Sequence, residues 1–288
     1  MYPTSSERQY YEQEIEAVEF LVPPYGSHRV IAALPRLSAL RIVQVNSAGV
    51  DWIAPSVPEG VTLCNARGTR DAPVAEWVVG TILDSYKGLT RFRRQQEQAQ
   101  WKPRMPRELA GSKALIVGYG SIGRAVENRL RPFGVEVTGL GSRQRGTTLG
   151  VDALDELLPL ADIVIVLLPA TPETVGLIEK QRLARLKPGA LLVNCARGGI
   201  VDEEALLEAL ESGTLGGAAL DVFAEEPPRD LRLVRHPKVV ATPHLGAQTH
   251  EAQERISRET AEMVMAALSG SMAVAAVNLP FRPAGGRA

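Results

Sequence analysis

The sequence has little cysteine and no long apolar run. Only two cysteines, Cys64 and Cys195, occur in 288 residues, which excludes a disulfide framework and fits a reducing compartment. Both lie in apolar runs, so we expect buried free thiols. No window approaches the roughly 18 uninterrupted apolar residues of a transmembrane helix, and Met1–Thr4 do not begin the basic-then-apolar pattern of a secretion signal. We therefore expect a cytoplasmic protein that does not span a membrane.

The sequence also lacks a surplus of charge of either sign. Lys and Arg number 32, Asp and Glu number 33, and the formal net charge is -1. This balance argues against a nucleic-acid-binding surface and against a polybasic membrane patch. The arginine-rich stretch at residues 91–94 is short and is typical of a solvated helix face. No His or Cys cluster has metal-ligand spacing, so we predict no metal site.

Strand and helix patterns alternate through the central part of the chain. The run Ile163–Leu168 is continuously apolar, as in a strand that is covered on both faces. Apolar residues recur at helical spacing in three segments. One lies before Gly134, one ends near Leu186, and one is Asp202–Glu211. The alternation predicts an α/β fold with a doubly wound parallel sheet. The expected strands are Ala114–Val117, Val135–Gly139, Ile163–Leu168, Ala190–Cys195, Gly217–Phe223 and Val239–Thr242.

The two ends of the chain have a different pattern, which suggests two domains. A polar arm, Gln95–Arg107, contains two prolines and connects the parts. We predict a central domain at residues 88–255 and a second, discontinuous domain formed by residues 1–87 and 256–288. The other elements expected outside the centre are short strands at Phe20–Val22, Arg41–Asn46 and Val61–Asn65, helices at Ala72–Thr90 and Gln248–Leu268, and a loose tail, Pro280–Ala288.

A glycine-rich segment follows the first central strand. Its residues Gly118-Tyr119-Gly120-Ser121-Ile122-Gly123 fit the G-x-G-x-x-G pattern between a strand and an amphipathic helix. Gly118 permits a tight turn, Gly120 lets the backbone approach a pyrophosphate, and Gly123 lets helix and strand pack closely. The helix start offers free N–H groups and a positive dipole end to the phosphates. The central domain is therefore predicted to be a Rossmann domain that binds a dinucleotide through these six residues.

The residues after the second central strand bear on which nicotinamide cofactor binds. NAD-binding sites place Asp or Glu there for the ribose hydroxyls, but counting 18 residues on from Gly123 reaches Gly141. Ser142, Arg143 and Arg145 follow, and a hydroxyl with guanidinium groups suits the 2′-phosphate of NADP. We predict NADP in preference to NAD, bound by Ser142 and Arg143. The alternative is that the arginines are only loop charges.

Three segments place polar residues at the ends of later strands, where open α/β sheets bind their ligands. They are residues 193–202, 220–227 and 241–247, and they contain Arg197, Glu226 and His244. His is suited to proton transfer near neutral pH, and a neighbouring carboxylate orients the ring and favours its charged form. Arg is a planar, permanently charged partner for a substrate carboxylate. Taken singly, each residue has another interpretation. Arg197 fits a surface charge, Glu226 a loop carboxylate, and His244 a structural residue that caps a strand.

With Arg197, Glu226 and His244 in this spacing, the chain resembles the D-isomer-specific 2-hydroxyacid dehydrogenases. This family includes glyoxylate/hydroxypyruvate reductases and 3-phosphoglycerate dehydrogenases. The resemblance runs from about Leu40 to Asn278 and includes Ala48-Gly49-Val50-Asp51, Val74-Ala75-Glu76, the glycine motif and the three polar segments. It implies a smaller, flavodoxin-like α/β substrate domain beside the Rossmann domain, here shortened at the N-terminus by about one βα unit. It also implies a homodimer formed through the cofactor domain, with the arm Gln95–Arg107 as the contact.

The resemblance implies a role for each candidate residue. Arg197 binds the substrate carboxylate and carbonyl, His244 is the general acid/base, and Glu226 holds His244. Backbone N–H groups of Ala48 and Gly49 complete the carboxylate site. The reaction implied is reduction of a small 2-keto acid to its 2-hydroxy acid by hydride transfer from NAD(P)H. Besides the glycine motif, Ser142 and Arg143, the expected cofactor contacts are Leu168, Pro169, Thr174, Cys195, Ala196, Arg197, Asp221, His244 and Gly246.

Two other functions are compatible with the same fold. Transcriptional corepressors use it to sense a dinucleotide, and retained catalytic residues do not exclude that function. Formate oxidation is disfavoured, because the related formate dehydrogenases have Gln where this chain has Glu226. No regulatory domain is recognised after the dehydrogenase unit, so we expect glyoxylate or hydroxypyruvate rather than the substrate of a long, amino-acid-sensing phosphoglycerate dehydrogenase.

Overall fold

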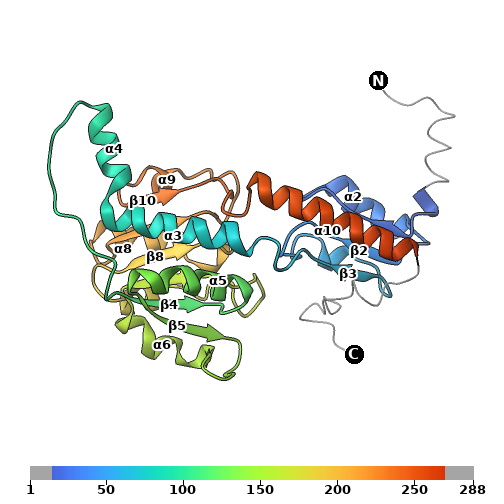
Figure 1. Cartoon of the computed structure of the whole chain (residues 1–288), viewed down its shortest axis with the longest axis horizontal. Helices are drawn as coiled ribbons and strands as arrows, with labels where there is room; N and C mark the ends of the chain where they lie inside the picture. The colour runs from blue at the N-terminus through green and yellow to red at the C-terminus, as the bar shows by residue number, and fades with distance from the viewer. Residues whose placement is uncertain (1–14, 270–288) are drawn as a thin grey trace. The chain divides into compact units, whose positions relative to one another are not determined.

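The chain forms two units in a computed structural model that describes residues 15–269. One unit comprises residues 71–249, and the other combines residues 1–70 with residues 250–288. The expected tail Pro280–Ala288 lies outside the described residues (Figure 1). Of the helices in the described part of the chain, none is both long and apolar enough to cross a membrane.

The larger unit contains a parallel sheet of seven strands in the order β10-β9-β8-β7-β4-β5-β6. The strands β5 and β6 extend the sheet on one side of β4, and the chain then crosses back to place β7 on its other side, so the strand order reverses at β4. This reversal is the switch point at which open α/β sheets bind ligands. The strands are β4 (Lys113–Val117), β5 (Glu136–Gly141), β6 (Leu149–Gly150), β7 (Ile163–Val166), β8 (Leu191–Asn194), β9 (Gly217–Leu220) and β10 (Val239–Ala241).

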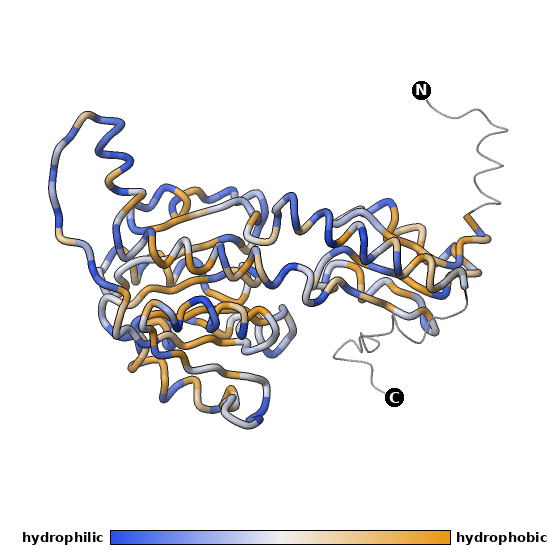
Figure 2. The backbone as a smooth tube through the Cα atoms, viewed as in Figure 1, coloured by the Kyte–Doolittle hydropathy of each residue, from blue (hydrophilic) through white to orange (hydrophobic). Residues whose placement is uncertain are grey.

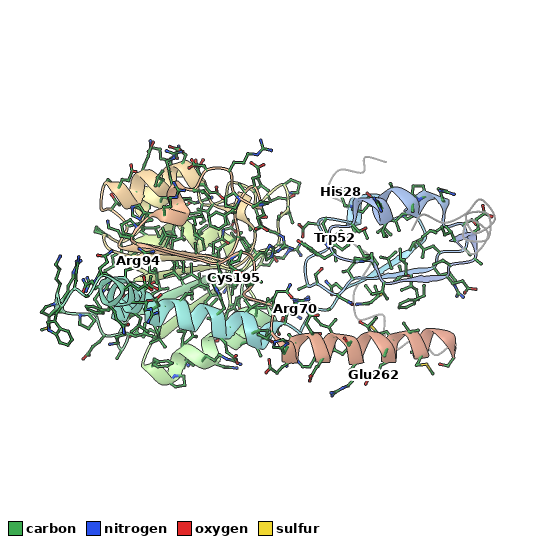
Figure 3. All side chains as sticks on the ribbon, turned by 90° about the horizontal axis from the view of Figure 1, so that it is seen from above. His28, Trp52, Arg70, Arg94, Cys195 and Glu262 are labelled. Atoms are coloured by element: carbon green, nitrogen blue, oxygen red, sulfur yellow. The ribbon has the colours of Figure 1, made fainter. Side chains whose placement is uncertain are left out.

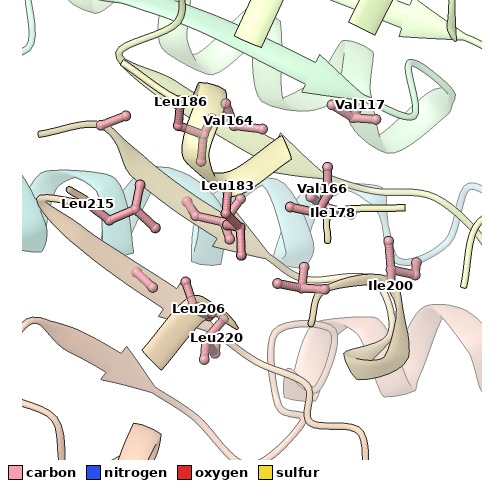
Figure 4. Close-up of a cluster of buried hydrophobic side chains, with 14 of the residues drawn as sticks. Val117, Val164, Val166, Ile178, Leu183, Leu186, Ile200, Leu206, Leu215 and Leu220 are labelled. Atoms are coloured by element: carbon pink, nitrogen blue, oxygen red, sulfur yellow. The ribbon is translucent and has the colours of Figure 1, made fainter. Parts of the chain in front are cut away.

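Helices cover both faces of this sheet. Alternate residues of a strand point to opposite faces: Ile116 of β4 packs in one buried cluster with α3 (Asp71–Lys87) and α5 (Ser121–Leu130). Val117 packs in the other with α6 (Leu154–Leu157), α7 (Lys180–Arg185) and α8 (Glu203–Glu211), as Figure 4 shows in part. Apolar segments accordingly run through the middle of the unit in Figure 2. The doubly wound Rossmann fold expected from the sequence is confirmed.

The smaller unit has a parallel sheet of three short strands, β1 (Phe20–Leu21), β2 (Ile42–Gln44) and β3 (Thr62–Cys64), in that order. Its core gathers Leu34, Val43 and Ile53, and it includes the helices α2 (His28–Ala33) and α10 (His250–Leu268). The side chains of α10 hold the segment after β3. Thr69 bonds to Glu259, and Arg255 donates to the Thr69 carbonyl oxygen at 3.2 Å.

The structure divides the chain at different residues from the boundaries set on sequence. The unit boundaries fall at 70/71 and 249/250, not at 87/88 and 255/256. The helix α3 belongs with the cofactor-domain sheet, because its Val78 and Ile82 share a buried cluster with Val126 of α5. Amphipathicity predicts that a helix is half-buried but does not say which core it covers.

Several other elements also differ from the sequence-based expectation. The helix expected at Ala72–Thr90 breaks at Gly88, whose φ of 67° is left-handed, and α4 (Leu89–Glu97) starts beyond it. The arm therefore begins after Glu97 rather than at Gln95. The short edge strand β6 was not expected, and of the helical segment ending near Leu186 only α7 is helical. The short helix α9 (Arg232–Arg235) lies between β9 and β10.

The contact between Gly198 and the loop after β9 offers a test of the packing. An added Cβ at Gly198 would lie 1.9 Å from the Phe223 carbonyl carbon, whereas one at neighbouring Gly199 would meet nothing within 4 Å. Both partners of the clash are backbone, which cannot rotate away. We expect Gly198→Ala to lower the free energy of unfolding by about 3 kcal/mol, and Gly199→Ala to change it by less than about 0.5 kcal/mol. Urea denaturation of both variants measures this, and equal midpoints would contradict the packing.

Candidate active site

The side chains of His244 and Glu226 meet in a hydrogen bond at the carboxyl ends of two neighbouring strands. The Nδ1 atom of His244 lies 2.7 Å from Oε2 of Glu226. The pair forms because β9 and β10 are in register, with Leu220 opposite Ala241, so the loops that follow them meet. The other Glu226 oxygen, Oε1, accepts the backbone N–H of Phe223 at 3.1 Å. The two side chains are 32% and 37% exposed, so the imidazole is both anchored and accessible.

The backbone of His244 has an unusual conformation for a residue other than glycine. Its φ is 55°, in the left-handed region, which costs on the order of 1–3 kcal/mol when the surroundings do not enforce it. The buried residue Asp221 enforces it here. The backbone N–H of His244 donates to the Asp221 carbonyl oxygen at 2.8 Å, and those of Leu245 and Gly246 donate to its carboxylate at 2.8 Å each. Strained backbone of this kind clusters at functional sites.

Arg197 lies on the segment that follows β8, the neighbour of β9. Asn194, the last residue of β8, shapes this segment because its buried side chain accepts the Ala196 N–H at 3.1 Å and donates to the Arg197 carbonyl oxygen at 3.0 Å. Arg197 is half-buried, and its Nη1 donates to the Ala196 carbonyl oxygen at 2.7 Å. Gly198 then packs against the loop that carries Glu226. The sequence analysis missed Asn194, although a polar residue at the end of an apolar strand is a usable signal.

Cys195 differs in part from the expectation for both cysteines. Cys64 is buried as expected, whereas Cys195 is only half-buried and is labelled in Figure 3. Its Sγ lies 3.7 Å from Oδ2 of Asp221. Burial of the sulfur atom, and then the negative charge of Asp221, raise the pKa of the Cys195 thiol well above its usual value. Both effects favour the neutral thiol over the nucleophilic thiolate.

The glycine motif forms the turn between β4 and α5. Gly118 has a φ of 107°, and a Cβ there would lie 2.6 Å from the Leu167 carbonyl, so only glycine fits. The helix α5 begins after Gly120 without a side-chain cap, which leaves its first N–H groups for an anion. The hydroxyl of Tyr119 bonds to Glu127, and its ring covers Gly139. The Tyr119 side chain is therefore engaged within the protein, which leaves its backbone for the predicted phosphate contact.

The other expected cofactor residues lie at the same edge of the sheet. Leu168 and Pro169 follow β7, and Thr174 folds back to donate its hydroxyl to the Pro169 carbonyl oxygen at 2.6 Å. Ser142 and Arg143 follow β5 and are exposed. The carboxylate of Asp221 has contacts within the protein on both of its oxygens, so its contact with a cofactor stays a prediction.

Ala48 and Gly49 lie in the smaller unit, in the loop after β2. Asn65 donates to the Ala48 carbonyl oxygen at 2.9 Å, and the Ser47 hydroxyl donates to the Gly49 carbonyl oxygen at 2.6 Å. These bonds fix the peptide planes of the loop.

Several polar residues near the site have other roles. The arginines between Glu226 and His244 are exposed, and two of them form surface ion pairs: Arg229 with Glu225, and Arg232 with Glu204. In the described residues, no group of three or more His, Cys, Asp or Glu side chains is placed to hold a metal ion.

Similarity to known proteins agrees with this arrangement. Residues 79–246 match the D-isomer specific 2-hydroxyacid dehydrogenase, NAD binding domain. The chain is 39% identical over 254 residues to D-3-phosphoglycerate dehydrogenase of Bacillus subtilis, covering 85% of this chain and 48% of that protein. The chain thus spans about half the length of the curated relatives it matches.

Solved structures have the same fold. A D-isomer specific 2-hydroxyacid dehydrogenase family protein from Aeromonas salmonicida aligns with a TM-score of 0.79 and 31% identity over 91% of this chain and 86% of that chain. A relative from Xanthobacter autotrophicus, crystallised with NADPH and MES, aligns with a TM-score of 0.75 and 31% identity over 88% of this chain and 82% of that chain. With its doubly wound sheet, its glycine motif and the matched residues 79–246, the chain belongs to the D-isomer-specific 2-hydroxyacid dehydrogenase family.

Proposed function

We propose that this protein reduces a small 2-keto acid, such as glyoxylate or hydroxypyruvate, to the corresponding D-2-hydroxy acid with NADPH as hydride donor. The observation that carries the proposal is the His244–Glu226 pair, with 2.7 Å between Nδ1 and Oε2, on the same sheet edge as the glycine motif and Arg197. An accessible imidazole backed by a carboxylate is a proton donor, and a ketone reduction needs one.

The residues of the larger unit fit a dinucleotide. Gly118 and the uncapped start of α5 provide a turn that a side chain would block and N–H groups that suit a pyrophosphate. The residues that would hold the cofactor follow β4, β5, β7, β8 and β9 along one edge of the sheet. When bound, the reduced nicotinamide supplies a hydride to the carbonyl carbon of the substrate.

The residues of this chain supply binding and the proton. Arg197 binds the substrate carboxylate with two parallel hydrogen bonds and so orients the keto group. Since Nδ1 of His244 faces Glu226, its Nε2 is the atom that gives a proton to the carbonyl oxygen. The proton from Nε2 would complete the hydroxyl group of the product, while the bound cofactor would supply the hydride for the new C–H bond. Glu226 keeps the imidazole oriented and stabilises its positive charge before the transfer.

The preference for NADPH rests on the end of β5. This strand ends at Gly141 with no carboxylate, and exposed Ser142 and Arg143 follow it. A missing acid removes the repulsion against a 2′-phosphate, and a guanidinium binds it. The Xanthobacter relative was crystallised with NADPH, while a D-lactate dehydrogenase from Aquifex aeolicus, 26% identical, was crystallised with NAD.

A second substrate is favoured by the similarity to D-3-phosphoglycerate dehydrogenases, which reaches 39% identity. The oxidised partner of 3-phosphoglycerate is a 2-keto acid with a phosphate on its side chain, and the same Arg197 and His244 would handle its carboxylate and carbonyl. A panel of glyoxylate, hydroxypyruvate and 3-phosphohydroxypyruvate separates the two proposals by their kcat/KM values. No turnover on the panel, with tight NADPH binding intact, would favour a dinucleotide sensor instead.

The proposed homodimer uses the arm after α4. Trp101 and Met105 of this arm are 95% and 93% exposed, and the segment projects from the rest of its unit in Figure 1. Large apolar side chains held out in solvent are typical of a protein–protein contact. The partner that suits them here is the same surface of a second copy, because closed two-fold contacts are the commonest form of self-association.

Replacement of the catalytic imidazole is the first test of the mechanism. We expect His244→Ala to lower kcat by about 10²–10⁴-fold, because the general acid is lost. Arg197→Ala should raise KM for the keto acid and lower kcat together. The control is His236→Ala, which removes a histidine that directly follows α9 and has no assigned role. Its kcat should stay within about twofold of wild type. Steady-state rates of NADPH oxidation measure all three, and a His244→Ala enzyme as fast as the control would remove His244 from the mechanism.

The cofactor preference has its own test. We expect Arg143→Ala to raise KM for NADPH by roughly tenfold, since a charge-assisted hydrogen bond to the 2′-phosphate is worth about 1.5 kcal/mol or more. KM for NADH in the same variant is the internal control and should not change. A wild-type enzyme that prefers NADH, or equal changes for both cofactors, would refute the assignment.

The dimer is tested by placing charge on the arm. Wild-type protein should sediment as a dimer, and the double variant Trp101→Glu/Met105→Glu as a monomer, because two carboxylates do not tolerate burial in an apolar contact. Leu160→Glu alters an apolar side chain of the same unit that is 58% exposed, and it should remain dimeric. Analytical ultracentrifugation distinguishes these outcomes, and a monomeric wild type contradicts the proposal.

A further inference from the structure

We propose that Thr242, held by Trp77, is a positioning residue that sets the place of His244. Its hydroxyl joins helix α3 to the buried carboxylate around which the His244 loop folds. This inference rests on the proposed function in one respect: it takes His244 as the proton donor. The contacts themselves lie entirely within the larger unit.

The hydroxyl of Thr242 takes part in two strong hydrogen bonds with a defined direction. It donates to Oδ1 of Asp221 at 2.5 Å, and it accepts from Nε1 of Trp77 at 3.0 Å. An indole N–H can only donate and a carboxylate can only accept. The Thr242 hydroxyl therefore donates its proton to Asp221 and accepts the Trp77 N–H with a lone pair. Such a chain is polarised along its length, which strengthens each bond.

The carboxylate of Asp221 is bound by both ends of the segment 242–246. Asp221 is only 2% exposed. Thr242 binds it from one end of the segment, and the N–H groups of Leu245 and Gly246 bind it from the other at 2.8 Å each. His244 lies between these attachments in its left-handed conformation. A sparsely populated backbone conformation persists only where its surroundings enforce it, so loss of either attachment loosens the backbone that carries the imidazole.

The segment is closely packed at Gly246. A Cβ at Gly246 would lie 2.8 Å from Oδ2 of Asp221 and 2.9 Å from Sγ of Cys195. At the other end, Pro243 follows Thr242 and restricts its backbone. The Trp77 ring packs against the buried cluster of α3 and α5, so the donor that orients the Thr242 hydroxyl is itself anchored in the core. Through Trp77 and Thr242, helix α3 thus fixes the position of the loop that carries His244.

The test compares variants that differ in this hydroxyl or its donor. Thr242→Val removes the hydroxyl at nearly equal volume, Thr242→Ser retains it, and Trp77→Phe removes the indole donor but keeps an aromatic ring. Thr81→Val is the matched control, since this buried hydroxyl bonds only within α3, to the Val78 carbonyl oxygen. Rates are measured with NADPH and the best keto acid of the panel, together with the Kd for NADPH.

We expect Thr242→Val to lower kcat by about 10–100-fold, because a misplaced proton donor loses the geometry of the transition state. Its Kd for NADPH should stay within about threefold of wild type. Trp77→Phe should show a smaller fall in kcat, and Thr242→Ser and Thr81→Val should stay within about fivefold of wild type. A merely structural role for Thr242 would weaken NADPH binding and kcat together and would not be rescued by Ser.

A second measurement does not depend on turnover. Amide hydrogen exchange of Leu245 and Gly246, followed by mass spectrometry, should be faster in Thr242→Val and in Trp77→Phe, and unchanged in Thr81→Val. If wild-type protein turns over no keto acid, the proposed function fails, while the exchange result still decides the positioning role. If Thr242→Val does not fold, Trp77→Phe decides it. Wild-type kcat and wild-type exchange in the variants would overturn the inference.

Discussion

The buried carboxylate of Asp221 is the group on which the candidate site depends. A buried charge must be satisfied by hydrogen bonds, and here the donors come from the segment that carries His244. The electrostatic requirement of one side chain therefore fixes the backbone of another. The left-handed φ of 55° at His244 is a direct consequence. Once it is fixed, the imidazole meets the Glu226 carboxylate on the adjacent loop at 2.7 Å.

Parallel strand order explains why the remaining groups gather near this carboxylate. The segments that hold Arg197, Glu226 and His244 follow β8, β9 and β10, which are consecutive neighbours in the sheet. The glycine motif follows β4, two strands further along. Because all the strands are parallel, their carboxyl ends share one edge. Close packing locks this edge, since Gly118 and Gly198 lie where no side chain fits. Family membership and geometry thus agree on this edge of the larger unit's sheet as the candidate active site.

The chemistry at this edge separates into two tasks. The fold provides the cofactor site from backbone groups, namely a tight turn and an uncapped helix start, which leave little to the identity of side chains. The residues proposed for substrate binding and proton transfer are instead three side chains whose positions are set by loops. In the proposed function, the choice of substrate and of cofactor therefore rests on few side chains, such as Arg143 after β5.

The sequence by itself determined the doubly wound sheet, the glycine turn and the three polar segments, because apolar runs, helical spacing and turn residues are local signals. It placed Glu226 and His244 together only through resemblance to a family. The tertiary structure alone decided that α3 covers the cofactor-domain sheet, that Gly88 divides a helix, and that Cys195 faces a carboxylate. It alone joined Trp77 to Thr242, 165 residues apart in sequence. A hydrogen bond between distant residues leaves no periodicity in the chain, so only the packed fold reveals it.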